Sequence, residues 1–148
     1  MTVQNLLTET IATGNIDTFD AIFTINVIDH DPLRGQQAGV EGLKESYRKL
    51  RLAFHYINIT IERTIADERN VCIAYTLTGV HSGVYQGIEP TNKPISVRGV
   101  KVSRFENGMI AERWGSINEY SIVDQLKKGA VGPLLSPTFT TAKSPSLV

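Results

Sequence analysis

The chain has 148 residues, of which 41% are hydrophobic and 20% charged, which is the size and composition of one ordinary globular domain. Fifteen Lys and Arg balance fifteen Asp and Glu, so the formal net charge is zero and the basic surface of a nucleic-acid-binding protein is not expected. No segment approaches the roughly 18 apolar residues of a membrane span, and the N-terminus lacks a basic segment followed by an apolar run. We therefore expect a cytoplasmic protein that binds neither nucleic acid nor membrane.

The single cysteine and the three histidines predict neither a disulfide nor a metal site. Cys72 lies in an apolar stretch and has no partner for an internal disulfide, so we expect it to be a buried small hydrophobic residue. The histidines at positions 30, 55 and 81 are scattered and lack paired carboxylates at ligand spacing. Glycines 83 and 87 do not form a phosphate loop, because no Lys-Ser or Lys-Thr step opens a helix after them.

Two amphipathic segments open the chain. Apolar residues recur every three or four positions in residues 2–13, which predicts a helix with Thr2 as its N-cap and Gly14 at its end. Asn15 is a candidate cap for a second, short helix whose apolar face includes Phe23. The segment that follows runs to Pro32, which stops any regular structure before it.

A third helix is predicted by the most regular apolar stripe in the sequence. Its members lie on one helical face: Val40, Leu43, Tyr47, Leu50 and Phe54. The acidic residues of this segment come early and the basic residues late, the order that the helix dipole favours.

From Tyr56 onward the apolar period changes from about four residues to two, which predicts strands. The first strand ends at a turn over residues 67–70, and the second covers residues 71–81, with Tyr75 and Leu77 on one face. A loop with several Gly and Pro residues precedes a third strand at residues 95–105.

The Asn107-Gly108 pair predicts a type I′ hairpin turn, after which a fourth strand returns to about Ser116. A final helix is expected from Glu119 to Lys128 and is stopped by Gly129. The last residues are rich in Ser, Thr, Pro and Gly, so we expect residues 1–128 to form the domain and residues 129–148 a C-terminal tail.

Helices followed by strands in hairpin succession predict an α+β fold with a curved antiparallel sheet, rather than a doubly wound parallel one. One helix layer against the concave face of such a sheet encloses a cavity, which is a common place for a ligand.

Five short motifs resemble the SnoaL-like polyketide cyclase family, within the nuclear-transport-factor-2-like superfamily of α+β cones. They are Asp29-His30-Asp31-Pro32, the glycines and Gln36 around "GQ..G.EG", "TGVHSGVYQGIEPTNK" from Thr78 to Lys93, "RFENGMI", and Glu112 with Trp114 in "E.W". The resemblance covers about residues Thr2 to Leu126. The resemblance does not identify the substrate, because this fold hosts cyclases, isomerases, hydrolases and binding proteins.

The resemblance implies a reaction and a partner. Well-understood members close a ring on an aromatic polyketide by intramolecular aldol condensation, without a metal or organic cofactor, and an aspartate abstracts the proton. Such an enzyme supplies a base of suitable pKa, a dry pocket and donors for the developing oxyanion. The family also implies homodimers through the exposed face of the sheet.

The position of the family's aspartate, four residues after the tryptophan, is Asn118 in this chain. An amide cannot take up a proton at ordinary pH, so the family's mechanism cannot simply be carried over. Asn118 shares strand parity with Trp114 and also precedes the last helix, so it is a candidate both for the pocket and for the N-cap of that helix.

His30, flanked by Asp29 and Asp31, is the best remaining acid/base candidate, because a neighbouring carboxylate can orient an imidazole and raise its pKa. The alternative is a loop in which the aspartates satisfy backbone donors before Pro32. His81 ends a strand in the "G.H.G" motif, where it donates either to a ligand carbonyl or to the backbone.

The expected wall of the pocket is aromatic: Trp114, Tyr47, Phe54 and Tyr75, with Asp31 near the opening. A core role is the alternative for Trp114. The basic residues of the third strand, Arg98, Lys101 and Arg104, are expected at solvent or subunit contacts rather than as oxyanion clamps.

Three hypotheses follow. The first is a cofactor-independent enzyme acting on a small, hydrophobic, carbonyl-bearing substrate, with His30 as acid/base, His81 and Asn118 as hydrogen-bond donors and Trp114 as a wall. The second is a non-catalytic ligand-binding relative that kept the cavity and lost the aspartate. The third is an interaction module that assembles subunits through the outer face of the sheet and the tail.

Overall fold

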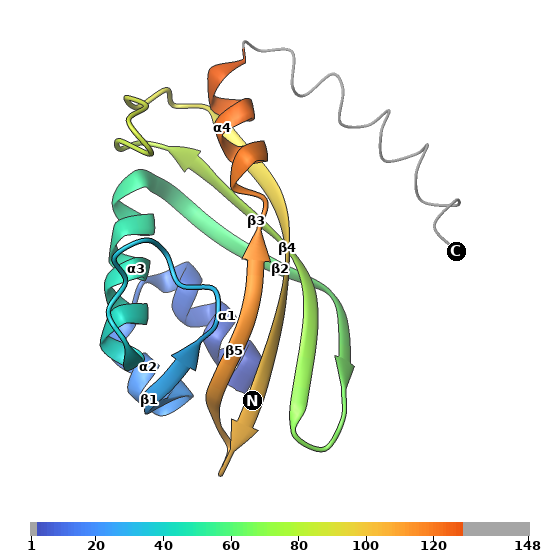
Figure 1. Cartoon of the computed structure of the whole chain (residues 1–148). Coiled ribbons are helices and arrows are strands. Elements are labelled where there is room, and N and C mark those ends of the chain that lie inside the picture. The colour runs from blue at the N-terminus through green and yellow to red at the C-terminus, as the bar shows by residue number, and fades with distance from the viewer. Residues whose placement is uncertain (1–2, 129–148) are drawn as a thin grey trace, which may run out of the picture.

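A curved sheet carries helices α1, α2 and α3 on one face, and α4 lies at one end of it (Figure 1). The structure is a computed structural model that describes residues 3–128. Its strands are β1 (Phe23–Asp29), β2 (Phe54–Ala66), β3 (Asn70–His81), β4 (Pro94–Glu106) and β5 (Met109–Ile117). Its helices are α1 (Val3–Thr13), α2 (Phe19–Ile22), α3 (Gly39–Ala53) and α4 (Glu119–Lys127), with a 3-10 turn, η1 (Ile16–Thr18), before α2.

Within the described residues the sheet has five strands in the order β1-β5-β4-β3-β2. Strands β2 to β5 are antiparallel neighbours, as predicted, so the α+β class and the curved sheet are confirmed. Strand β1 pairs with β5 in parallel, with Asp29 opposite Arg113, which makes the sheet mixed rather than purely antiparallel.

Strand β1 is the element that differs from the sequence prediction, which placed Phe23 on the face of a short helix. Helix α2 ends at Ile22, and the next residues are extended. Three of the seven residues of β1 are valine or isoleucine, and such side chains favour extended backbone. The free edge of β5 supplies the pairing partner, which lies far away in the sequence and left no local signal.

The predicted hairpin at Asn107-Gly108 is confirmed. Both residues have positive φ, 50° and 79°, as a type I′ turn requires. The turn aligns β4 with β5 so that Val102 lies opposite Trp114 and Lys101 opposite Gly115. From Glu112 to Ile117, the side chains of β5 are thereby assigned alternately to the two faces of the sheet.

Alternate residues of the central strands face the helices and form the core. This inner face is mostly apolar and includes Ile57, Ile59, Ile73, Leu77, Ile95 and Val97. Helix α1 packs on β2, and α3 packs on β1 and β2. Arg51 of α3 donates from Nη1 to the carbonyl of Ile11 at 3.0 Å, which joins α3 to the end of α1.

Cys72 lies on the opposite, outer face of the sheet, where it is only partly buried. The expectation of a buried cysteine is therefore wrong: its apolar neighbours in sequence, Val71 and Ile73, lie on the inner side of the alternation. The predicted tail, residues 129–148, lies outside the described residues. None of the described helices is long and apolar enough to cross a membrane.

Candidate functional site

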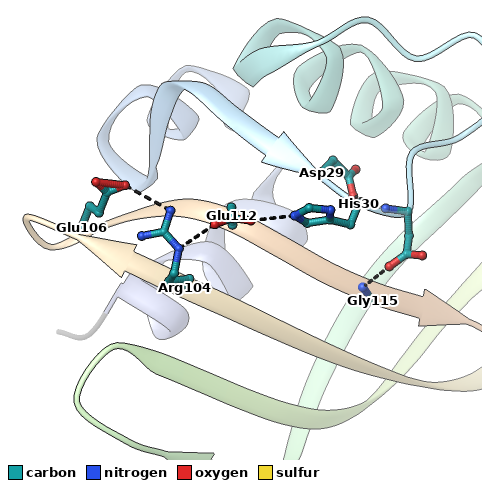
Figure 2. Close-up of polar contacts among 7 residues, drawn as sticks. Asp29, His30, Arg104, Glu106, Glu112 and Gly115 are labelled. Carbon is teal, nitrogen blue, oxygen red and sulfur yellow. Dashed lines mark hydrogen bonds and ion pairs between the residues drawn. The ribbon is translucent and has the colours of Figure 1, made fainter.

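His30 takes part in an ionic network across the outer face of three strands (Figure 2). Its Nε2 donates to Glu112 Oε2 at 2.7 Å, and Arg104 Nε donates to Glu112 Oε1 at 2.7 Å. Arg104 also pairs with Glu106 at 3.2 Å. His30 and then Arg104 hold the pKa of the Glu112 carboxyl below its ordinary value. The carboxylate partner of His30 is therefore Glu112, and not the flanking Asp29 or Asp31 that the sequence suggested.

Trp114 stacks on His30, with ring centroids 4.5 Å apart and ring planes 4° from parallel. The indole lies opposite Val102, on the face that points away from the helices, and is 37% exposed. The sequence prediction of Trp114 as a wall of the inner pocket is thus not supported by its placement. The alternation of β5 turns Trp114 and Glu112 outward and Arg113 inward.

Asp29 points in the direction opposite to His30, toward the helix layer. Arg113 Nη1 donates to Asp29 Oδ2 at 3.0 Å, and Gln36 Nε2 donates to the same oxygen at 2.8 Å. The Asp29 side chain is only 7% exposed, so this ion pair is shielded from water. The pair fixes the guanidinium of Arg113 on the inner face of the sheet.

Asp31 holds the loop after β1 in place. Its Oδ2 accepts a hydrogen bond from the backbone N–H of Gly115 at 2.8 Å, and its own N–H donates to Asp29 Oδ1 at 3.1 Å. The sequence left two interpretations of this loop open, a catalytic role for His30 or aspartates that accept hydrogen bonds from backbone N–H groups. The contacts of Asp29 and Asp31 agree with the second interpretation. Asp31 is exposed.

A second polar group lies on the inner face of the sheet, around Arg113. Tyr75 of β3, Lys101 of β4 and Arg113 of β5 belong to that face, and Tyr47 of α3 approaches them from the helix layer. Burial raises the pKa of Tyr47 well above its ordinary value and also raises the pKa of Tyr75, so both phenols stay protonated. The four side chains bring donors together in a largely apolar interior.

Lys101 corrects the sequence prediction that it contacts solvent or another subunit. It shares the inner face with Ile73, its partner on β3, and its ammonium lies 5.6 Å from the centre of the Tyr75 ring. Burial, and then the charge of Arg113, lowers the pKa of Lys101 to about 7. By contrast, Arg98 and Arg104 lie on the outer face, where Arg98 is exposed and pairs with Glu62 at 3.5 Å.

His81 is fully buried at the end of β3, near Phe54 and Tyr85. The backbone N–H of Thr91 donates to His81 Nδ1 at 3.1 Å, so in the neutral ring the proton resides on Nε2. That Nε2 has no hydrogen-bond partner among the described residues. A buried donor without an acceptor is costly, which makes His81 a candidate for donating to a ligand oxygen. Phe54 is buried in the same place, 5.5 Å from the His81 ring.

Asn118 is the N-cap of α4. Its Oδ1 accepts a hydrogen bond from the backbone N–H of Ser121 at 3.0 Å. The structural alternative offered by the sequence is therefore confirmed, and its role in a pocket stays a prediction.

Two shallow grooves open on the surface of the described residues, at a distance from the inner polar group. One, of about 280 Å³, lies beside the His30 network and is lined by Ile28, Arg104 and Met109, among others. The other, of about 370 Å³, lies between α1 and β2 at Thr8 and Asn58. Within residues 3–128, no group of three or more His, Cys, Asp or Glu is placed to hold a metal ion.

Residues 1–126 match the family model described as SnoaL-like polyketide cyclase. A putative polyketide cyclase from Acidithiobacillus ferrooxidans is 26% identical, with a TM-score of 0.75 over 86% of this chain and 94% of that one. IdmH, a putative polyketide cyclase from Streptomyces antibioticus, is 20% identical, with a TM-score of 0.76 over 85% and 96%. TsrD from Streptomyces laurentii is 17% identical, with a TM-score of 0.78 over 84% and 92%.

No curated protein matches the sequence. The two neighbours below 25% identity show the fold alone, an α+β fold with a curved sheet and helices. The family match spans nearly all of the described residues and agrees with the motifs in the sequence. The chain belongs to the SnoaL-like polyketide cyclase family.

Proposed function

We propose that this protein binds a small, hydrophobic, carbonyl-bearing molecule against the inner face of the sheet and cyclises or isomerises it by abstracting a proton next to the carbonyl, without a cofactor. The supporting observation is the convergence of Tyr75, Lys101 and Arg113 on one apolar face, with Tyr47 above them. Apolar pockets with a few convergent polar groups are the usual binding sites of small molecules.

The inner polar group suits the charge that develops in such a reaction. Removing a proton next to a carbonyl places negative charge on the carbonyl oxygen, and fixed donors in a water-poor site stabilise that charge. Arg113, held by Asp29, and the protonated phenol of Tyr75 are donors of this kind.

The chain has no carboxylate at the position where the family places the proton acceptor. The family resemblance puts the base at Asn118, and an amide cannot fill that role. Asp and Asn cap helices about equally well, so Asn118→Asp restores a carboxylate without losing the hydrogen bond to Ser121. We expect Asn118→Asp to create or increase ring closure of a polyketide-type ester. The loss of the open-chain substrate over time measures this reaction.

Asn118→Ala is the matched control, since it removes the cap and adds no base. If Asn118→Asp and Asn118→Ala both leave ring closure at the level of the uncatalysed reaction, the cyclase proposal is contradicted for this pocket.

The amide at Asn118 favours a second candidate function, a ligand-binding relative without turnover. Calorimetric titration with a panel of flat aromatic ketones and esters separates the two candidates. Saturable binding without consumption of any ligand supports the binding protein, and the absence of binding across the panel contradicts both. Tyr75→Phe should weaken binding about fivefold, because it removes one donor of about 1 kcal/mol from the inner face.

A further inference from the structure

Lys101 is a lysine on the inside of a sheet, next to another cation. It lies on β4, the middle strand of the sheet, with Ile73 beside it on β3 and Gly115 beside it on β5. Gly115 lies close against β4, because an added Cβ there would be 3.0 Å from the carbonyl oxygen of Val100 and 3.3 Å from Lys101 Cα. Lys101 as a whole is partly buried, and its ammonium lies 5.6 Å from the centre of the Tyr75 ring.

The charged and titratable groups around Lys101 do not neutralise it. Asp29 on β1 is the carboxylate whose charge acts on Lys101. Its side chain accepts hydrogen bonds from Arg113 and Gln36, and not from Lys101. No carboxylate among the described residues forms an ion pair with the Lys101 ammonium. Arg113 on β5 opposes its charge, and Tyr75 on β3 offers only a ring face and a protonated phenol.

A lysine in these surroundings loses its proton easily. Desolvation and a neighbouring cation both favour the neutral amine, and such lysines attack carbonyl carbons. The pKa of about 7 means that roughly half of the Lys101 amines are neutral at neutral pH, against about one in a thousand or fewer for an ordinary exposed lysine.

We propose that Lys101 is a nucleophile that forms a Schiff base with a carbonyl group of the bound molecule. The inference rests on the proposed function in one respect, the presence of a carbonyl in the ligand, and it does not depend on the base at position 118. It assigns a covalent role to a residue that the family motifs do not include.

The step balances without any further reactant. The lone pair of Lys101 Nζ attacks the carbonyl carbon, and the carbonyl oxygen takes up a proton to give a carbinolamine. The hydroxyl then leaves as water while the nitrogen loses its remaining proton, so the C=O bond is replaced by C=N. The protonated phenol of Tyr75 lies on the same face and is a candidate donor for the departing water.

The test uses acetylacetone, a small diketone whose Schiff base with a lysine rearranges to a stable, absorbing enaminone. We incubate the full-length protein with it at neutral pH and map the adduct by peptide mass spectrometry. The expected result is one adduct per chain, a gain of one diketone less one water, on Lys101. Lys101 should react at least about tenfold faster than any other lysine, because its neutral fraction is so much larger.

Two variants complete the experiment. Lys101→Met should lose the adduct, whereas Lys49→Met, which removes an exposed lysine of α3, should keep it. Adduct spread evenly over the lysines of the wild-type protein would overturn the proposal, even if Lys101→Met failed to fold. Labelling of Lys101 without binding of any larger ketone would instead uphold the nucleophile and contradict the proposed function.

Discussion

At the scale of single residues, Glu112 is the carboxylate on which the outer ionic network depends. It accepts from His30 and from Arg104, and these partners lower its pKa in the folded protein. A carboxyl group with a lowered folded-state pKa stabilises the fold above its ordinary pKa and loses that contribution as the pH falls through the lowered value.

We therefore predict that Glu112→Gln lowers the melting temperature at neutral pH and that the difference from wild type disappears in acid. Thermal unfolding, monitored by circular dichroism from neutral to acid pH, measures this difference in melting temperature. Glu68→Gln, in the exposed turn between β2 and β3, is the matched control and should change the melting temperature little. A difference that stays constant from neutral to acid pH would contradict the assigned ion pairs.

Asn118 gives a second prediction at this scale. Asn118→Ala removes the acceptor for the Ser121 N–H and should lower the free energy of unfolding by about 1 kcal/mol, whereas Asn118→Asp should leave it nearly unchanged. Urea denaturation of the two variants checks this. An unchanged free energy of unfolding in Asn118→Ala would show that the cap adds little, and equal destabilisation by both variants would show that Asp does not replace Asn as the cap.

At the scale of elements, the β4–β5 turn depends on left-handed backbone at two successive residues. Gly108 has φ of 79°, and nothing lies within 4 Å of the place that an added Cβ would take. The cost of Gly108→Ala is thus conformational, about 1 kcal/mol in the free energy of unfolding by urea denaturation. Asn107→Gly is the control and should be tolerated, because glycine adopts the same conformation freely.

The elements that the sequence predicts correctly are those whose structure is determined by residues close together in the sequence. The Asn107-Gly108 pair, the apolar stripe of α3 and the alternation in β3 each decide their structure within a few residues. Strand β1 is different, because its short segment becomes a strand only where β5 offers an edge. Pairing over such a distance leaves no periodic signal in the sequence.

The same limit explains which site residues were missed. The sequence suggested that His30 and Trp114 both serve an inner pocket, whereas their stacked rings lie on the outer face of the sheet. Arg113, one residue before Trp114, is turned inward by the alternation of β5, and the strand pairing makes Lys101 its diagonal neighbour. Counting parity from buried Val97 to Lys101 was the signal that could have identified this lysine.

At the scale of the whole molecule, the outer face of the sheet carries a row of apolar side chains. The strand register lines up Trp114, Val102, Cys72 and Ile65 across four strands, and Val100 lies one row away. Val100 is 52% exposed and Ile65 69%. Contiguous apolar surface of this kind marks interaction sites, and a twofold contact would cover it with the same face of a second copy.

We predict a homodimer at micromolar concentration, measured by light scattering. Val100→Lys should shift the protein toward monomer, because two lysines would then be buried in the contact. Ala12→Lys adds the same charge on helix α1, away from the outer face, and should leave the mass unchanged. A wild-type protein that scatters as a monomer would contradict this prediction.

The parallel β1–β5 pairing also constrains how the chain reaches its native state. It joins Asp29 to Arg113, which are 84 positions apart, so the intervening segment has to be ordered before this contact forms. Contacts between distant positions slow folding, and the hairpins β2–β3 and β4–β5 can assemble first. On the ribosome, β1 therefore waits without its partner until β5 has emerged, and a nascent chain exposes an open strand edge for most of its synthesis.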